Sequence, residues 1–286
     1  MKRLNSNYKY GRLADMFHGF FVRSEIRRLT REGLPLFSRV NIETQNWCNG
    51  TCEFCPVNRR DNPRKKAIMP DAMFKDILRQ LADLDYAGRL GLNANNEPLL
   101  DERITEFAAL ARKAVPRAML YLFTNGTLLT DSKLNELMKS LDTLCITNYG
   151  GTKARKRLSK IGVEKFEGRV VIDDFGSRDI RTSRAGQAKN KSVVKGLKSP
   201  CIYPFVQFVI CADGKVIQCC ADAINLSNMG NIGEQPLTGI WFGSEFEKTR
   251  SALLESRQGN KLCANCDMFA FMPERLVCIS RKLFKK

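Results

Sequence analysis

Three cysteines lie close together in the first quarter of the chain, and no histidine accompanies them. Cys48, Cys52 and Cys55 have the spacing C-x3-C-x2-C. Four thiolates close a structural zinc or iron–sulfur site, whereas three leave one metal position open. In a cubane cluster, three cysteines bind three irons, and the fourth iron is free to chelate another ligand. The spacing therefore favours a four-iron cluster with one open iron, because a zinc site would need a fourth ligand from a distant part of the chain.

A second cysteine set follows in the last third of the chain. Four thiolates from two hairpin-like turns can hold either zinc or a fully ligated [4Fe–4S] cluster, and their spacing alone leaves both open. Two other cysteines lie within strand patterns, and we interpret them as buried apolar side chains. The four candidate ligands are Cys201, Cys219, Cys263 and Cys266; the two buried side chains are Cys145 and Cys211; Cys220 is an alternative to Cys219, and Cys278 is either a hydrogen-atom donor or a spare thiol.

The elements around the first cysteines predict an α/β fold. Between residues 39 and 175, five strand patterns alternate with amphipathic helix patterns, which indicates βαβ units and a parallel sheet. Polar, Gly- and Asn-rich segments follow the strands, where such a fold assembles its active site. Five units are too few for a closed eight-unit barrel, so we expect a partial, open (β/α) barrel.

The rest of the chain is predicted to flank this barrel. Residues 12–32 have helical periodicity within an N-terminal segment, 1–38, and residues 176–200 are a basic linker. Residues 201–286 form a smaller α+β module, with a hairpin around an Asp-Gly turn and a helix-period stretch at 240–255.

The net charge of the chain indicates which classes of partner it binds. There are 47 Lys and Arg against 30 Asp and Glu, a net charge of +17. This excess indicates either a polyanionic partner, such as nucleic acid or a phosphorylated small molecule, or a solvated basic face.

The one histidine, His18, leaves little room for histidine-based zinc sites or general bases, and we interpret it as an ordinary side chain of the first helix. Clustered cysteines without a secretory or membrane-spanning apolar run favour a reducing cytoplasm.

The first cysteine cluster, with Phe54 before its third cysteine, resembles the hallmark of the radical S-adenosylmethionine (SAM) enzymes. The resemblance implies a partial β/α barrel and a cluster whose open iron binds SAM through its amino and carboxylate groups. It also implies that one electron cleaves the sulfonium and yields a 5′-deoxyadenosyl radical, which takes a hydrogen atom from the substrate.

Three other segments are similar to conserved parts of that family. LNANNEPLL (92–100) resembles its glycine-glycine-glutamate loop, with Glu97 at the carboxylate that meets the SAM ammonium group and two asparagines at the glycine positions. FTNGTLLT (123–130) places Thr124 and Asn125 near the ribose. In TSRAG (182–186), Arg184 either pairs with a substrate or SAM carboxylate or is one more solvated arginine.

The C-terminal cysteines resemble the SPASM/twitch auxiliary-cluster extension of these enzymes. Gly214-x4-Cys219, the segment 229–231 and the pair Ile240-Trp241 match, and the small number of later cysteines favours the single-cluster twitch form. The resemblance implies that Cys201, Cys219, Cys263 and Cys266 hold an auxiliary [4Fe–4S] cluster, which accepts an electron or positions the substrate.

The resulting prediction is a radical SAM oxidoreductase, a dehydrogenase or epimerase, that takes a hydrogen atom from a small polar, carbohydrate-like or alcohol substrate. An anionic group on that substrate would suit the basic residues at 153–198. Reduced flavodoxin or ferredoxin would supply the electron. One alternative is a peptide maturase, although the forty residues before the barrel leave no space for a precursor-recognition domain. Another class is a basic zinc protein that binds nucleic acid, which the cysteine spacing disfavours.

Overall fold

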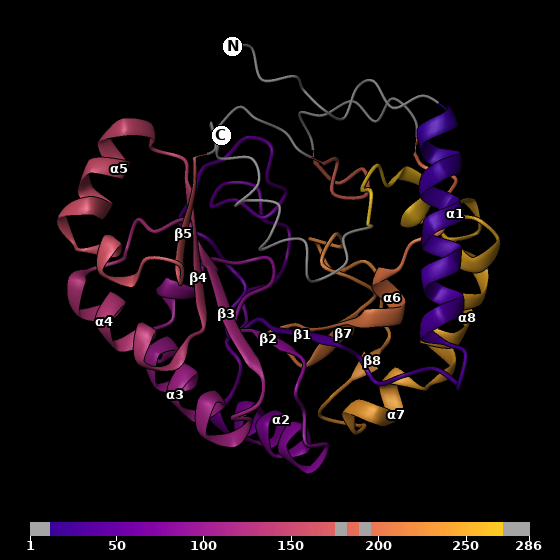
Figure 1. Cartoon of the computed structure of the whole chain (residues 1–286), viewed down its shortest axis with the longest axis horizontal. Coiled ribbons are helices and arrows are strands. Elements are labelled where there is room, and N and C mark those ends of the chain that lie inside the picture. The colour runs from indigo at the N-terminus through magenta and orange to yellow at the C-terminus, as the bar shows by residue number, and fades with distance from the viewer. Residues whose placement is uncertain (1–11, 175–181, 189–195, 271–286) are drawn as a thin grey trace.

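The computed structural model describes residues 12–174, 182–188 and 196–270, and Cys278 lies outside them. Five parallel strands run in the order β5-β4-β3-β2-β1, as the alternating pattern predicts. The helices between them cover the convex face of the curved sheet (Figure 1). The strands are β1 (Arg39–Ile42), β2 (Arg89–Gly91), β3 (Met119–Thr124), β4 (Thr143–Asn148) and β5 (Val170–Asp174), and the helices are α2 (Asp71–Asp83), α3 (Ile104–Ala114), α4 (Asp131–Ser140) and α5 (Gly151–Lys160).

Helical spacing of apolar residues holds these helices on the sheet. In α2, the buried residues Phe74, Ile77, Leu78 and Leu81 follow the i, i+3, i+4, i+7 pattern of one helix face. Phe74 stacks on Phe107 of α3, with ring centroids 4.0 Å apart. Val40, Leu90 and Leu122 meet this layer from the strands. This packing fixes the helices on the sheet, and the loops at the carboxyl ends of the strands are thereby held in place.

The C-terminal module continues the same sheet. Strand β6 (Gln207–Ile210) pairs in parallel with β1, and β7 (Lys215–Ile217) returns antiparallel to it, which confirms the predicted hairpin. The short strand β8 (Gly230–Asn231) completes an eight-stranded open sheet. Backbone hydrogen bonds therefore join the module directly to the barrel.

The predicted helix-period stretch at 240–255 is two helices. Helix α7 (Leu237–Trp241) ends before Gly243, and α8 (Ser244–Glu255) begins after it. A Cβ at Gly243 would lie 2.7 Å from the carbonyl oxygen of Gly239, so the chain turns at the residue without a side chain. The other short helical segments are α6 (Tyr203–Val206) and the 3₁₀ turns η1 (Pro98–Leu100), η2 (Val163–Phe166), η3 (Arg257–Gly259) and η4 (Cys263–Asn265).

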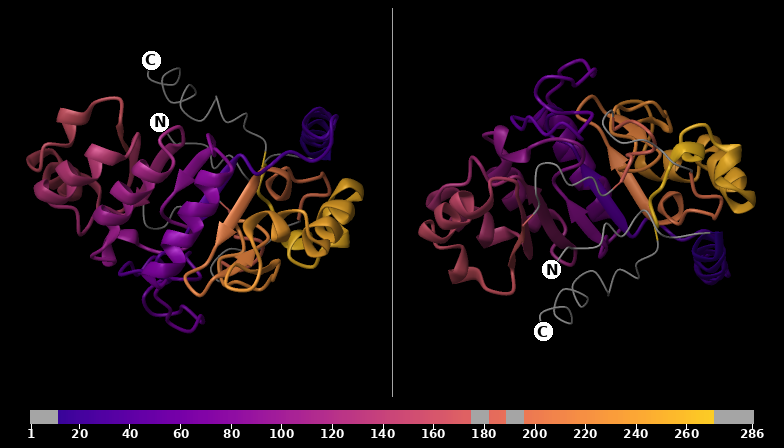
Figure 2. Two further views of the ribbon diagram at one scale, coloured as in Figure 1. Left: turned by 90° about the horizontal axis from the view of Figure 1, so that it is seen from below. Right: turned by 90° about the horizontal axis from the view of Figure 1, so that it is seen from above.

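The N-terminal helix α1 (Arg12–Leu29) packs on the C-terminal module (Figures 1 and 2). Its Val22 and Ile26 form a cluster with Phe205. Its His18 lies 2.7 Å from the Ser199 hydroxyl through Nδ1, and burial lowers the pKa of His18 to about 4. His18 therefore has the structural role expected of it. None of the helices in the described residues combines the length and apolar character needed to cross a bilayer.

Candidate active site

A cavity of about 1060 Å³ is formed by the loops that follow β1 to β4. Cys48, Cys52 and Cys55 line it, and so do Glu97 and Arg184. The loops after neighbouring parallel strands meet at one edge of a sheet, which explains how lining residues from Cys48 to Gly150 converge. Arg184 joins them from the described segment after β5. Phe54, Thr124 and Asn125 also line this cavity, so every residue predicted for the first site lies around it.

Asparagine side chains shape the cysteine loop. Asn58 donates from Nδ2 to the carbonyl oxygens of Cys52 and Cys55, at 3.2 and 2.8 Å. At the base of the loop, Asn46 accepts from the Ala67 N–H at 3.0 Å and donates to the Lys65 carbonyl at 2.7 Å. These bonds satisfy backbone groups that no strand or helix satisfies, and so they fix the conformation of the loop that carries the three cysteines.

A buried ion pair connects this loop to the next one. Arg64 donates to both carboxylate oxygens of Glu43, at 2.9 and 3.1 Å, and the side chains are 4% and 0% exposed. The other nitrogen of the fork donates to the carbonyls of Asn46 and Asn95, at 2.6 and 2.7 Å. Burial raises the pKa of Glu43, and Arg64 opposes that shift. One guanidinium thus fixes the cysteine loop and the loop after β2 relative to each other.

Replacing Arg64 should destabilise the protein strongly. In Arg64→Ala, the Glu43 carboxylate stays buried without its partner, and the free energy of unfolding should fall by about 3–5 kcal/mol. Chemical denaturation, monitored by circular dichroism, measures this free energy of unfolding. The control is Arg79→Ala, which removes exposed pairs with Asp76 and Asp83 and should cost less than about 1 kcal/mol. Equal losses in the two variants would contradict this role of the pair.

Glu97 is the centre of the loop after β2. Its carboxylate accepts from the Thr124 hydroxyl at 2.6 Å, from the Asn125 N–H at 2.7 Å and from the Leu99 N–H at 3.0 Å. Burial raises the pKa of Glu97, while these donors act in the opposite direction. Asn125 also donates to Asn49, beside Cys48, at 2.8 Å. The three residues predicted from two separate motifs therefore form one hydrogen-bonded group next to the cysteine loop.

Asn95 has an amide group without a protein partner. The residue is 2% exposed and lines the cavity, and neither its Oδ1 nor its Nδ2 forms a hydrogen bond. Its backbone is held on both sides, because its N–H donates to Glu43 and its carbonyl accepts from Arg64. Buried amides without partners are rare in proteins, so this group is suited to a polar ligand in the cavity.

The segment around Arg184 lies between the two cysteine sets. Arg184 lines the first cavity, whereas its neighbour Ala185 lines the pocket of the second set. Both have left-handed backbones, with φ of 50° and 54°, and such strain in residues other than glycine is typical of functional sites. Ser183 bonds to Asp267, and Gln187 bonds to Asp222, both in the C-terminal module. This described part of the predicted linker is therefore packed against the module.

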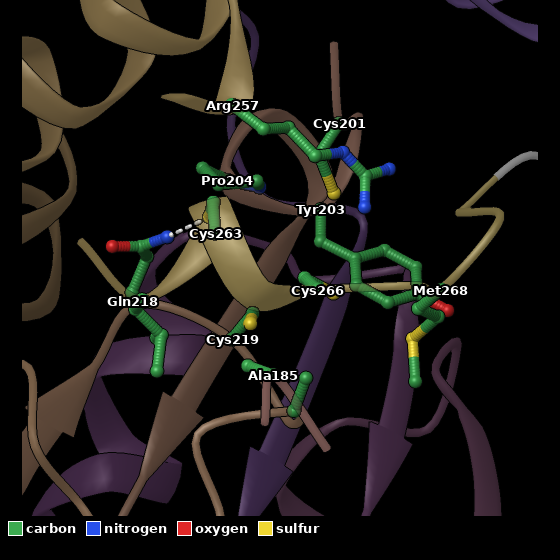
Figure 3. A pocket seen from close by; sticks show the side chains of 12 residues that line it. Ala185, Cys201, Tyr203, Pro204, Gln218, Cys219, Arg257, Cys263, Cys266 and Met268 are labelled. Carbon is green, nitrogen blue, oxygen red and sulfur yellow. Dashed lines mark hydrogen bonds between the residues drawn. The ribbon is translucent and has the colours of Figure 1, made fainter. Parts of the chain in front are cut away.

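The second cysteine set surrounds a small pocket in the C-terminal module (Figure 3). All four predicted thiols line it, and they are 6–7% exposed. Burial raises the pKa of Cys201 to about 11 and that of Cys263 to about 12. Thiols with such high pKa values need a bound metal to become thiolates at neutral pH.

Two further side chains of this pocket have no distinguishing pattern in the sequence. Gln218 donates from Nε2 to the Cys263 sulfur at 2.9 Å, and Arg257 is fully buried with one nitrogen, Nη1, lacking a hydrogen-bond partner. Among the described residues, no three His, Cys, Asp or Glu side chains converge enough to bind one metal ion. A four-iron cluster binds each thiolate through a different iron, so it spaces its ligands more widely. The four thiols and the buried, unpartnered Nη1 of Arg257 fit such a cluster.

Comparison with known proteins identifies the family. Residues 42–167 match the model described as the radical SAM superfamily. The chain is also 30% identical over 243 residues to the S-adenosyl-L-methionine-dependent 2-deoxy-scyllo-inosamine dehydrogenase of Niallia circulans, with 84% of this chain and 96% of that protein covered.

The chain belongs to the radical SAM superfamily.

The C-terminal residues 201–267 match the SPASM model, an iron–sulfur cluster-binding domain. Two solved structures extend the likeness to three dimensions. The crystal structure of BtrN in complex with AdoMet and 2-DOIA has a TM-score of 0.72 at 30% identity, and it covers 82% of this chain and 94% of that one. BtrN in an open conformation has a TM-score of 0.63 at 28% identity, with the same coverage.

The predicted family and fold are therefore confirmed. This radical SAM enzyme is an oxidoreductase that reductively cleaves SAM and takes a hydrogen atom from a small-molecule substrate. Its cofactors are SAM, a [4Fe–4S] cluster with an open iron and an auxiliary [4Fe–4S] cluster. The domain boundaries at residues 38, 175 and 200 stay predictions, and so do the roles of individual residues.

Proposed function

We propose that the enzyme oxidises a secondary hydroxyl group of a small cyclic polyol or amino polyol to a ketone. The observation that carries the proposal is the match over 96% of the length of a 2-deoxy-scyllo-inosamine dehydrogenase. The match covers 84% of this chain, and so it includes both the barrel and the auxiliary module, which supports a similar reaction. The likeness to BtrN bound to AdoMet and 2-DOIA supports the same class of substrate.

Cys48, Cys52 and Cys55 are the proposed ligands of the SAM cluster, and Cys201, Cys219, Cys263 and Cys266 those of the auxiliary cluster. When bound, the SAM cluster and SAM supply the 5′-deoxyadenosyl radical that removes the hydrogen atom. The residues of the chain bind and orient SAM, exclude water and hold the substrate near that radical. Phe54, which contacts Tyr149 with ring centroids 6.0 Å apart, would form an apolar wall of the SAM site.

Glu97 would accept from the SAM ammonium group, with Thr124 and Asn125 fixing its carboxylate next to the ribose. Asn95 would add a hydrogen bond to SAM that a glycine at this position could not provide. These assignments depend on the shared cavity and on the hydrogen bonds that join the three loops.

Replacing Asn95 should weaken SAM binding without lowering the stability of the protein. In Asn95→Ala, the Kd for SAM should rise about tenfold, equivalent to ~1.4 kcal/mol, because one hydrogen bond to a charged ligand is lost. The free energy of unfolding without SAM should not fall, since the amide has no partner to lose. Equilibrium binding and chemical denaturation measure the two effects. An unchanged affinity for SAM would contradict the proposed hydrogen bond from Asn95.

The substrate would lie between the SAM site and the Arg184 segment. Thr147 and Tyr149 line this side of the cavity and suit hydroxyl groups, while Arg184 suits a carboxylate or another anionic group. Most basic side chains of α5 are exposed, and Arg157 bonds to the carbonyls of Gly126 and Leu129. An anionic substrate group would therefore be recognised mainly by Arg184 and Arg60, which also lines the cavity.

The electron donor would be reduced flavodoxin or ferredoxin. Thr51 and Glu53, inside the cysteine loop, are exposed, so a small carrier protein can approach the SAM cluster closely. We assign the enzyme to the cytoplasm. Cysteines clustered as proposed iron–sulfur ligands support a reducing compartment.

Anaerobic turnover tests the proposal. The reconstituted enzyme is incubated with SAM, a reductant and a panel of cyclic polyols and amino polyols that includes 2-deoxy-scyllo-inosamine. Oxidation predicts a ketone and one 5′-deoxyadenosine for each turnover. An epimer carrying solvent deuterium would instead indicate an epimerase, and turnover of peptides alone would indicate a maturase.

A further inference from the structure

Arg257 is a buried cation without an acidic partner. The side chain is 0% exposed, and its Nε and Nη2 donate to the carbonyls of Ser199 and Pro200, at 2.8 and 3.4 Å. Its Nη1 has no partner, and in the described residues no carboxylate forms an ion pair with it. Asp15 interacts electrostatically with Arg257, but its carboxylate accepts its hydrogen bonds from the backbone N–H groups of Lys198 and Ser199. An unpaired buried charge costs several kcal/mol, so this site is suited to an anion.

The four cysteines are positioned to supply that anion. Arg257 lines the same pocket as Cys201, Cys219, Cys263 and Cys266, and Figure 3 shows its guanidinium beside Cys201. Four thiolates around a four-iron cluster carry net negative charge, which grows by one when the cluster is reduced.

Gln218 acts on the same site from the other side. Its Nε2–H donates to the Cys263 sulfur at 2.9 Å (Figure 3), and the side chain is 2% exposed. Asn260 fixes the orientation of this amide, because it donates to the Gln218 carbonyl at 2.9 Å while accepting from the Cys263 N–H at 3.1 Å. Hydrogen bonds to cluster sulfurs and nearby positive charge stabilise the reduced cluster.

We propose that Arg257 and Gln218 raise the reduction potential of the auxiliary cluster and so make it the electron acceptor of the reaction. The inference rests on the proposed function. After the hydrogen atom is removed, the substrate is a carbon radical that bears the hydroxyl group. It loses one electron to the auxiliary cluster and one proton to solvent, and the C–O bond becomes a carbonyl. The reduced cluster then returns its electron to the oxidised flavodoxin or ferredoxin.

A redox titration tests the effect of Arg257 and Gln218 on the reduction potential without turnover. In full-length protein with Cys48, Cys52 and Cys55 replaced by alanine, the auxiliary cluster is the remaining cluster, and its reduction is followed by electron paramagnetic resonance. Arg257→Gln should lower the equilibrium constant for reduction by about tenfold or more, which is ~59 mV for one electron. Gln218→Leu should lower it in the same direction by a smaller factor, and Arg257→Lys should stay near the parent value.

Arg250→Gln is the matched control. Arg250 is a buried arginine of the same module that lies over the Trp241 and Phe246 rings and outside the cysteine pocket, so its loss should have less than half the effect. Parent-like potentials for Arg257→Gln and Gln218→Leu, or an equal shift in Arg250→Gln, would overturn the inference. If Arg257→Gln does not fold, a parent-like potential in Gln218→Leu or a lowered one in Arg257→Lys overturns it. Colourless, iron-free parent protein would contradict the proposed auxiliary site itself.

Discussion

Cys52→Ala should abolish 5′-deoxyadenosine formation and leave the auxiliary cluster in place. The thiol lies in the cavity with Cys48 and Cys55, and no other thiol of the described residues lines that cavity to replace it. Losing a partner of a metal ligand costs about 10–100-fold in affinity or activity, so losing the ligand should cost more than about 100-fold. Iron should fall from about eight to about four atoms per chain, following from two four-iron clusters.

The control for this variant is Cys145→Ala. Cys145 lies within β4 and outside both cysteine pockets, so iron content and SAM cleavage should match those of the parent protein. A Cys52→Ala protein that still cleaves SAM at a comparable rate would remove the first cysteine set from the mechanism. Liquid chromatography of quenched anaerobic reactions and iron analysis of the same samples provide both readouts.

Cys263→Ala should uncouple SAM cleavage from product formation. The residue is a proposed ligand in the second pocket, and its sulfur is the one that Gln218 contacts. Without the auxiliary cluster, the substrate radical has no nearby electron acceptor. We expect 5′-deoxyadenosine to form while the ketone falls by more than about 100-fold. The ratio of the two products, measured in the same reaction, is the sensitive quantity.

Cys211→Ala is the matched control in the same module. Cys211 is 2% exposed in a small apolar cluster and lines neither pocket, so the ratio of ketone to 5′-deoxyadenosine should stay at one. Normal ketone formation by Cys263→Ala would eliminate the auxiliary cluster as the electron acceptor. The cluster would then have at most a role in positioning the substrate.

The parts that sequence predicts well depend on local patterns. The alternating strands and helices follow from apolar periodicity, and Cys48, Cys52 and Cys55 were proposed as ligands from thiol spacing within one loop. Glu97, Thr124 and Asn125 were assigned from two separate motifs, and the structure joins them by hydrogen bonds. Order along successive strands was enough, because the carboxyl ends of parallel strands meet at one edge.

The parts that sequence did not predict depend on contacts between distant residues. The pairing of β1 with β6 joins Arg39 to Gln207, and no periodicity indicates which edge the hairpin extends. Arg64, Gln218 and Arg257 occur in ordinary polar segments, and their importance comes from burial. A buried arginine has the same sequence signature as the many exposed ones in a chain of net charge +17. The N-terminal helix likewise gave no local sign that it packs beside the residues leading to Cys201.

Deuterium transfer during anaerobic turnover shows whether the 5′-deoxyadenosyl radical takes its hydrogen atom from the carbon that becomes the ketone. The substrate is a cyclic amino polyol that carries deuterium on the carbon of the oxidised hydroxyl group, and the 5′-deoxyadenosine is analysed by mass spectrometry. We expect one deuterium in each 5′-deoxyadenosine and one ketone for each SAM consumed. Ketone formed with no deuterium in 5′-deoxyadenosine, or without SAM, would contradict it.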